Sequence, residues 1–376
     1  MVFPLLPYYA QTFGATPSQI GLLAASFSIT QFIAAPILGR VSDRIGRKPI
    51  LAFALGGSSL AFLLFGYAKS LEMLFISRAL HGFFSAGAFP IAIAYIADIT
   101  TKEERLKYIS RLTATFAVAF IIGPAFSGFL SQFSINLPFY IASVVAFINL
   151  IFILRFLPES LTQKAEKLII REGFVNIKAI IYGLKGESGA FFFILFGWAF
   201  AISNLQVAFP LFSEKAFNFT SVENGYMFAY LGAVNATTQW FFVNKMTRLF
   251  GELKTVAMGV LFMATGQFLI PFSPVLGILL LVYSISSVGS SLFRPTTSAI
   301  ISKRTKEGQG TTMGLAFSFE SLGRIAGPLS AGVLIAIFGT KIQFILTSLV
   351  LYLGFIYLLI SFREPITQFK ADSSQN

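Results

Sequence analysis

A single carboxylate stands well inside the apolar part of the chain. Glu320 lies in a long apolar run, and Arg324 follows four positions later, on the same face of a helix. A carboxyl group in such surroundings stays neutral when it is desolvated and ionises when water or a cation reaches it. Glu320 and Arg324 are therefore candidates for binding and releasing a proton, and a permanent structural ion pair is the alternative.

A second charged site lies in an apolar run nearer the N-terminus. Arg78 and His81 share the pattern Leu74-x-x-x-Arg78-x-x-His81-Gly82. A guanidinium inside hydrocarbon normally faces a cavity or a carboxylate, or snorkels to the interface when it lies near a helix end. An imidazole titrates near neutral pH, or acts only as a hydrogen-bonding residue of a cavity. Further candidates for lining a cavity are Asn204, Gln206, Asn235, Gln239, Gln267 and Arg294.

The apolar runs that carry these residues predict membrane-spanning helices. The 376-residue chain is 55% hydrophobic and only 12% charged, whereas about a quarter of the residues of a soluble protein are charged. Backbone groups in hydrocarbon need internal hydrogen bonds, so the runs must be helical. The predicted spans, after a stub at 1–12, are 18–38, 49–68, 71–97, 108–130, 138–157, 190–212, 224–243, 254–272, 275–301, 312–337 and 342–362.

The spans fall into two groups of six that repeat each other. Gly123-Pro124-x-x-x-Gly128 recurs as Gly327-Pro328-x-x-x-Gly332, and other landmarks recur at the same offset of about 205 residues, which is typical of duplicated bundles. The repeat also indicates that the first helix lacks about 17 residues of a full span. The predicted domains are a bundle at 1–157 with an incomplete first helix, a cytoplasmic central loop at 158–189, a bundle at 190–362 and a cytoplasmic tail at 363–376.

A short charged stretch joins two of the spans. It is bracketed by Gly39 and Gly46 and contains Asp43 and the basic residues Arg44, Arg47 and Lys48. Basic loops stay in the cytoplasm. If this loop is inside and the sides alternate, Lys69, Lys215 and Lys341 are the only basic residues of the outer loops. The net charge of +12 is then a topology signal rather than a nucleic-acid footprint.

The loop pattern resembles the signature of the major facilitator superfamily, G-x-x-x-D-R-x-G-R-[RK]. Gly123, Pro124 and Gly128 resemble the helix 5 motif of its drug:proton antiporters, and the chain up to Glu159 resembles the tetracycline-exporter branch, although Ala61 stands where that branch has an acid. The resemblance implies an all-α fold of two six-helix bundles, a conformational gate at the Asp43 loop and a link between Arg78 and proton transfer. A plain topological turn and plain helix packing are the alternative readings of the two motifs.

These features together predict a secondary active transporter. We expect proton-coupled efflux of an amphipathic small molecule or drug by alternating access, by a monomer that spans the plasma or inner cell membrane several times. The alternatives are proton-coupled uptake or facilitated diffusion of a metabolite, or a transport-incompetent truncated remnant. The chain has no cysteine and one histidine, and it lacks a phosphate-binding loop. We therefore expect no enzymatic activity, cofactor, metal or nucleic-acid partner; the expected partners are lipid, a small-molecule substrate and protons.

Overall fold

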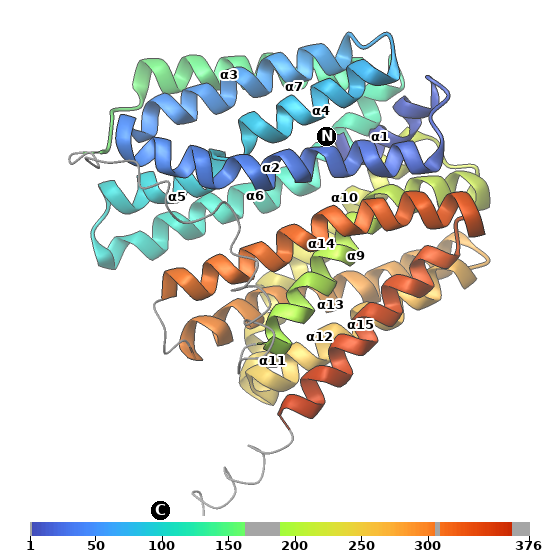
Figure 1. Ribbon diagram of the computed structural model, residues 1–376. Coiled ribbons are helices and arrows are strands. Elements are labelled where there is room, and N and C mark those ends of the chain that lie inside the picture. Colours follow the sequence, from blue (N-terminus) through green and yellow to red (C-terminus); the bar gives the residue numbers. More distant parts are fainter. Residues whose placement is uncertain (1, 162–188, 305–308, 363–376) are drawn as a thin grey trace, which may run out of the picture. The chain divides into compact units, whose positions relative to one another are not determined.

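The computed structural model describes residues 2–161, 189–304 and 309–362, and these residues form α-helices joined by short turns (Figure 1). The predicted central loop and tail lie mostly outside the described residues. The helices of the first half are α1 (Val2–Gln11), α2 (Pro17–Ile45), α3 (Arg47–Gly66), α4 (Leu71–Ser85), α5 (Ala88–Ile99), α6 (Lys102–Ser131) and α7 (Leu137–Phe156). Those of the second half are α9 (Gly189–Phe217), α10 (Ser221–Phe241), α11 (Val243–Phe250), α12 (Glu252–Leu269), the 3-10 turn η1 (Ile270–Phe272), α13 (Leu276–Arg304), α14 (Gln309–Phe338) and α15 (Ile342–Ser361).

Polar residues at the helix starts explain where several of these helices begin. Thr16 accepts a hydrogen bond from the backbone of Gln19, the Gln19 side chain bonds back to Thr16, and Pro17 opens α2. The side chains of Ser70 and Thr101 likewise accept a hydrogen bond from the backbone N–H three residues later, at the starts of α4 and α6. Such caps satisfy backbone N–H groups that have no partner inside the helix. The chain therefore marks its helix starts with local chemistry as well as with hydropathy.

The predicted loop at Gly39–Lys48 is wrong as a loop, because α2 continues through most of it. Gly46 alone interrupts the helix, with a φ of 121° that disfavours residues with a side chain, and α3 starts at Arg47. The second half repeats this arrangement at Gly251, which has a φ of 81° between α11 and α12. The predicted span at 71–97 is present as the membrane-capable stretch Leu71–Ile99, within which Ala86 and Gly87 divide α4 from α5. Polar residues end a membrane-buried stretch without ending a helix.

Ten helical stretches of the described chain are long and apolar enough to cross a membrane. They match ten of the predicted spans, whereas α1 and α10 are not among them. Side chains on α6 and α7 support contact with lipid, since Phe116, Phe120, Phe147, Phe152 and other large apolar residues of these helices are exposed. Apolar surface of this extent is tolerated in a membrane protein and avoided on soluble monomers.

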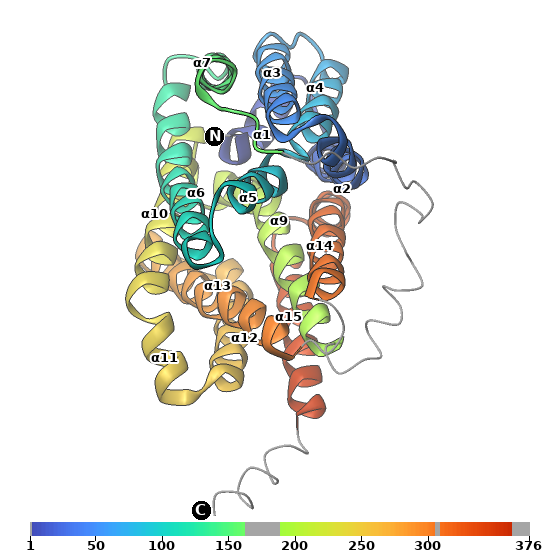
Figure 2. The ribbon, with the colours of Figure 1, turned by 90° about the vertical axis from the view of Figure 1, so that its left-hand side faces the viewer.

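The described residues form two compact units. The first contains 2–161, 206–232 and 328–337; the second contains 189–205, 233–304, 309–327 and 338–362. In the first unit α3 lies between α4 and α7, and α2 packs on α4 (Figure 1). In the second unit α12 packs against α13 and α15 (Figure 2). The predicted domain boundaries at 157, 189 and 362 stay a prediction.

Candidate functional site

The second unit holds a cluster of three charged side chains inside its membrane-spanning helices. Glu320 of α14 pairs with Arg324 one helical turn away at 2.9 Å and with Arg294 of α13 at 3.3 Å. Both guanidiniums bond through Nη2 to the same oxygen, Oε2. The Glu320 side chain is only 5% exposed, whereas the side chains of Arg294 and Arg324 are 42% and 40% exposed. The carboxylate is therefore much less accessible than the two cations that it neutralises.

A tryptophan of α9 supports one of these arginines. The guanidinium of Arg294 lies over the ring of Trp198, 4.9 Å from its centroid. The indole N–H of Trp198 donates to the Ser290 hydroxyl at 2.8 Å, which fixes the ring. Cation–π contacts of this kind stabilise a cation most when it is partly desolvated. Arg294 is thus held from one side by Glu320 and from another by Trp198.

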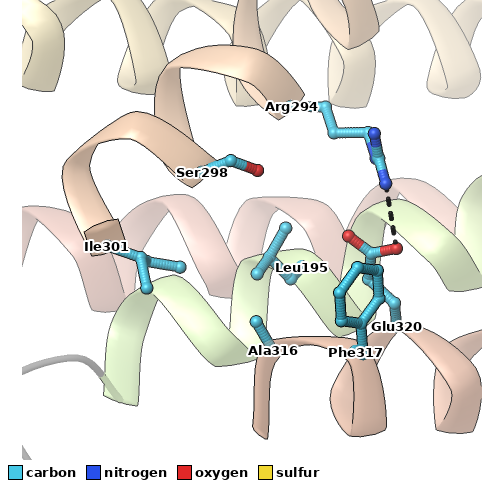
Figure 3. Close-up of a pocket in the computed structure, with 7 residues that line it drawn as sticks. All are labelled: Leu195, Arg294, Ser298, Ile301, Ala316, Phe317 and Glu320. Atoms are coloured by element: carbon cyan, nitrogen blue, oxygen red, sulfur yellow. Dashed lines mark hydrogen bonds and ion pairs between the residues drawn. The ribbon is translucent and has the colours of Figure 1, made fainter. Parts of the chain in front are cut away.

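A pocket opens beside this cluster, with about 280 Å³ of empty space when open solvent is included (Figure 3). Arg294 and Ser298 of α13 and Glu320 of α14 supply its polar lining, and the rest is apolar. The apolar residues come from three helices and are Leu195, Ile301, Ala316 and Phe317. Ligand sites commonly combine an apolar wall with a few polar groups in this way.

The first unit contains a buried cation of a different kind. Arg78 of α4 is 3% exposed, and its Nε has no hydrogen-bond partner. Its guanidinium lies 4.6 Å from the centroid of the Phe27 ring. The His81 ring lies between Phe27 and Phe62, at centroid distances of 5.1 and 4.3 Å. None of the ion pairs found in the described chain involves Arg78.

The charged stretch around Gly46 forms a network within the first unit. Arg47 donates to Ser42 at 2.7 Å, to Asp43 one turn earlier, and to Asp98 of α5 at 3.1 Å. Ser160 also donates to Asp98, at 3.0 Å. Among the other predicted members, Arg44 is exposed, Lys48 donates through Nζ to the Leu154 carbonyl at 3.0 Å, and Gly39 borders open space.

Glu159 completes this network by capping α3. Its carboxylate accepts backbone hydrogen bonds from Arg47 at 2.8 Å and Lys48 at 3.1 Å, and from Ser160 and Leu161 beyond. Burial of the carboxylate opposes ionisation, but these four N–H groups outweigh it and hold the pKa of Glu159 below its usual 4.5. A Cβ on Gly46 would lie 2.3 Å from the Glu159 carboxylate. Only glycine at position 46 permits both the turn and the cap.

The repeated glycine–proline motifs meet glycines of other helices in two matching seams. Gly225 of α10 packs on the helix 5 motif. A Cβ added to Gly225 would lie 2.7 Å from the Pro124 carbonyl oxygen and 2.7 Å from the Gly128 Cα. Gly21 of α2 packs on the second copy of the motif, and a Cβ added there would lie 2.3 Å from the Pro328 carbonyl oxygen and 2.9 Å from the Gly332 Cα. Both seams belong to the first unit. Backbones approach this closely only where side chains are absent.

The remaining cavity candidates do not line the pocket. Asn204 is buried and donates to the Gly327 carbonyl at 3.2 Å, and Gln267 is buried with its Nε2 unpartnered. Gln239 is exposed, while Gln206 and Asn235 are half-buried. Their role in a cavity stays a prediction. In the described residues no group of three or more His, Asp or Glu side chains could hold a metal.

Two members of these sites, Asp98 and Trp198, and one ion pair, Arg294 with Glu320, were not predicted from the sequence. The Arg294–Glu320 pair joins residues on different helices, so spacing along one helix could not reveal it. In the sequence, Asp98 stands out only as part of a motif and Trp198 only as an aromatic residue, so their contacts with Arg47 and Arg294 could not be predicted. The 205-residue repeat offered one signal, because it aligns Arg294-Pro295 with Phe89-Pro90 and so marks Arg294 as a charge that the first half lacks.

Comparisons with known proteins agree with this architecture. A sequence model of the Major Facilitator Superfamily matches residues 1–248 and 240–375. Multidrug resistance protein 1 of Bacillus subtilis (strain 168) is 33% identical over 367 residues, covering 97% of this chain and 92% of the relative. Quinolone resistance protein NorA of Staphylococcus aureus (strain Mu50 / ATCC 700699) is 27% identical over 340 residues, covering 89% and 85%. The solved nucleoside transporter NupG has a TM-score of 0.74 at 16% identity, over 96% of this chain and 94% of that chain.

These matches settle the class of protein. The structural likeness shows a shared fold, and the sequence matches extend over nearly the whole chain. Proteins of the matched family are membrane transporters of small molecules rather than enzymes. The ten membrane-capable helices agree with a multi-pass protein of the cell membrane. The chain is a secondary transporter that belongs to the Major Facilitator Superfamily.

Proposed function

We propose that this transporter exports an amphipathic small molecule in exchange for protons. The observation that carries the proposal is the Glu320 cluster, an ionisable carboxylate at the wall of a pocket inside membrane-spanning helices. Ionisable residues at such positions mark substrate and proton pathways. The relatives named for multidrug and quinolone resistance support efflux as the direction of transport. The proposed partners are the lipid bilayer, the substrate and protons, and the proposed working form is a monomer.

Glu320 is the proposed proton-carrying group. In its ionised form it holds Arg294 and Arg324 close together, because both guanidiniums bond to one of its oxygens. A protonated carboxyl group no longer compensates two positive charges, so the guanidiniums repel each other and the pocket wall changes shape. Gain and loss of one proton thus alternate the wall between two arrangements. Arg78 and His81 remain secondary candidates, since they lie together but face no carboxylate in the described chain.

The Gly46 network and the two glycine seams are the proposed conformational elements. Arg47 ties α2 to α5 through Asp98, and Glu159 ties the start of α3 to the end of the first bundle. The seams join α10 to α6 and α14 to α2 at ends that we predict to face the outside. Alternating access requires contacts that form in one state and separate in the other. Small-residue seams suit this role because they hold helices without burying charge.

Glu320→Gln tests the proton role in membrane vesicles. We expect efflux driven by an imposed pH gradient to fall to background, whereas substrate exchange without net proton movement persists. Glu104→Gln, which alters an exposed acid at the start of α6, is the matched control and should retain transport. Loss of exchange together with driven efflux would instead indicate that the pocket itself is lost.

A variant in which the whole cluster is neutral distinguishes proton coupling by Glu320 from a role as counter-ion of the two arginines. Removing Glu320 alone leaves two uncompensated arginines, and a buried charge that loses its partner is strongly destabilising. The triple variant Arg294→Gln, Glu320→Gln, Arg324→Gln removes that penalty. If gradient-driven efflux returns in the triple variant, Glu320 is only a counter-ion and the proton-carrying role is refuted. Continued loss of gradient-driven efflux, with membrane abundance and substrate exchange retained, supports it.

A further inference from the structure

The charge balance at the pocket favours a negative ligand. Glu320 of the pocket lining pairs with Arg294, which also lines the pocket, and with Arg324 next to it, so the cluster carries one excess positive charge when Glu320 is ionised. The exposures sharpen this point, because Arg294 and Arg324 are 42% and 40% exposed while Glu320 is only 5% exposed. Of the two charged groups that line the pocket, Arg294 and Glu320, the guanidinium is therefore the more accessible to an entering molecule. A lipophilic cation would be repelled at the same place.

The arginines also have hydrogen-bonding capacity to spare. A guanidinium offers five N–H donors in a planar fork that matches the two oxygens of a carboxylate. The ion pairs to Glu320 engage one nitrogen of each arginine, Nη2. The Nε of Arg294 is buried and has no hydrogen-bond partner. A donor left in this condition costs free energy that an arriving acceptor would recover.

The two guanidiniums are already in place for such a ligand. Glu320 holds both Nη2 atoms within 3.3 Å of one oxygen, and Trp198 supports Arg294 from the other side. A ligand that finds its donors preorganised loses less free energy to ordering them. Leu195, Ile301, Ala316 and Phe317 make up the apolar part of the lining (Figure 3). The pocket thus presents a cationic end and a hydrophobic wall.

We propose that this pocket binds an amphipathic organic anion, with its carboxylate on Arg294 of the pocket lining, beside Arg324, and its hydrophobic body against the apolar residues of the lining. The inference rests on the proposed function in taking the pocket as the substrate site, and it narrows the substrate from any amphipathic molecule to one that carries a negative group.

Binding is measured through the chain's own fluorescence. The sequence has two tryptophans, and Trp240 is 78% exposed on α10, so Trp240→Phe leaves Trp198 as the single reporter beside the pocket. Three anthracene probes of nearly equal size quench this emission: anthracene-9-carboxylate, its neutral amide, and 9-(aminomethyl)anthracene, a cation. We expect the purified transporter to bind the carboxylate at least about tenfold more tightly than either of the others, the difference that one charge-assisted contact supplies.

Variants of the chain then show which residues cause the preference for the carboxylate probe. Arg324→Gln should reduce it to within about threefold, because the excess charge disappears, while Arg324→Lys, which keeps the charge but not the fork, should retain part of it. Lys245→Gln, an exposed residue of α11, is the matched control and should leave the preference intact. Equal or tighter binding of the ammonium probe by the parent chain overturns the proposal without any variant. So does a carboxylate preference that is unchanged in Arg324→Gln.

Vesicle transport of the same probes separates the two proposals. A carboxylate preference in binding with no probe exported would defeat the proposed efflux function and leave the anion site standing. Export of the ammonium probe, matched by its tighter binding, would defeat the anion site and leave the efflux function standing.

Discussion

The two halves of the chain share a backbone plan but place their charges differently. Gly46 and Gly251 interrupt equivalent helices with positive φ, and the glycine–proline motifs meet equivalent glycines. The interior arginines do not correspond. Arg78 of the first half is 3% exposed and faces no carboxylate in the described chain, whereas Arg294 and Arg324 of the second half are partly exposed and share Glu320. The repeat therefore conserves geometry, and the ionisable chemistry is concentrated in one half.

The two glycines that interrupt these helices, Gly46 and Gly251, also differ in their surroundings. Around Gly46 a Cβ would collide with Glu159, and Arg47 links three acidic or hydroxyl partners. Around Gly251 nothing lies within 4 Å of an added Cβ. The first turn is a joint held by charge, whereas the second leaves space for an added Cβ. The first half thus supplies a charged joint, and the second half supplies the pocket.

Arg78→Met should give the largest change of the variants that test this contrast. A buried cation with no carboxylate costs several kcal/mol in desolvation, and the contact with Phe27 offsets part of it. We expect the apolar variant to raise the free energy of unfolding by about 1–3 kcal/mol and to lower efflux, measured by thermal unfolding and vesicle transport.

Arg324→Met is the matched comparison from the second half. It removes a partner of Glu320, so it should lower stability instead of raising it. If both variants changed stability in the same direction, the distinction between an unpaired and a paired arginine site would fail.

Gly225→Ala should have a moderate effect, and we expect it to shift the conformational equilibrium toward a state in which the seam between α10 and α6 is open. The new methyl group would lie 2.7 Å from the Pro124 carbonyl, so the seam between α10 and α6 must open at a cost of about 1–3 kcal/mol. A cysteine at Ser131, whose hydroxyl contacts that of Ser221 at 2.9 Å, reports this opening in a chain without native cysteine. We expect roughly tenfold faster labelling by an impermeant maleimide.

Gly277→Ala is the control for this experiment, because nothing lies within 4 Å of its added Cβ. Gly21→Ala should open the matching seam to a similar degree, since its Cβ would meet the Pro328 carbonyl. Unchanged labelling in Gly225→Ala would show that the seam does not hold the observed state.

The features that depend on neighbours along the chain could be predicted from the sequence. They include the ten membrane-capable helices, the contact between Glu320 and Arg324 four positions apart, and the motif glycines. Contacts between helices, such as Arg47 with Asp98 or Arg294 with Glu320, could not be predicted in this way. Hydropathy also misplaced the end of α2, because it reports which residues face lipid and not where backbone hydrogen bonds stop. Only Gly46 carried that information, through its conformational freedom.

Glu159→Gln should give the smallest effect, and its pH dependence identifies the cause. The ionised carboxylate accepts four backbone N–H groups, so its pKa in the folded chain lies below 4.5. A group whose pKa is lowered by folding stabilises the fold above its unfolded pKa, and this contribution is lost as the pH falls through the folded value.

We expect Glu159→Gln to lower the free energy of unfolding at pH 7 by about 0.5–1 kcal/mol, a value at the low end for a cap because the residue is exposed. The difference from the parent chain should shrink below pH 4.5 and vanish once Glu159 is protonated. Glu252→Gln, at the equivalent start of α12, should change stability less, because a Cβ added to Gly251 would have nothing within 4 Å, whereas one added to Gly46 would meet the Glu159 carboxylate. Thermal unfolding in detergent between pH 3.5 and 7 measures both variants. An equal loss for the two, or a loss for Glu159→Gln that is the same at every pH, would mean that the charged joint of the first half is no different from the plain turn of the second.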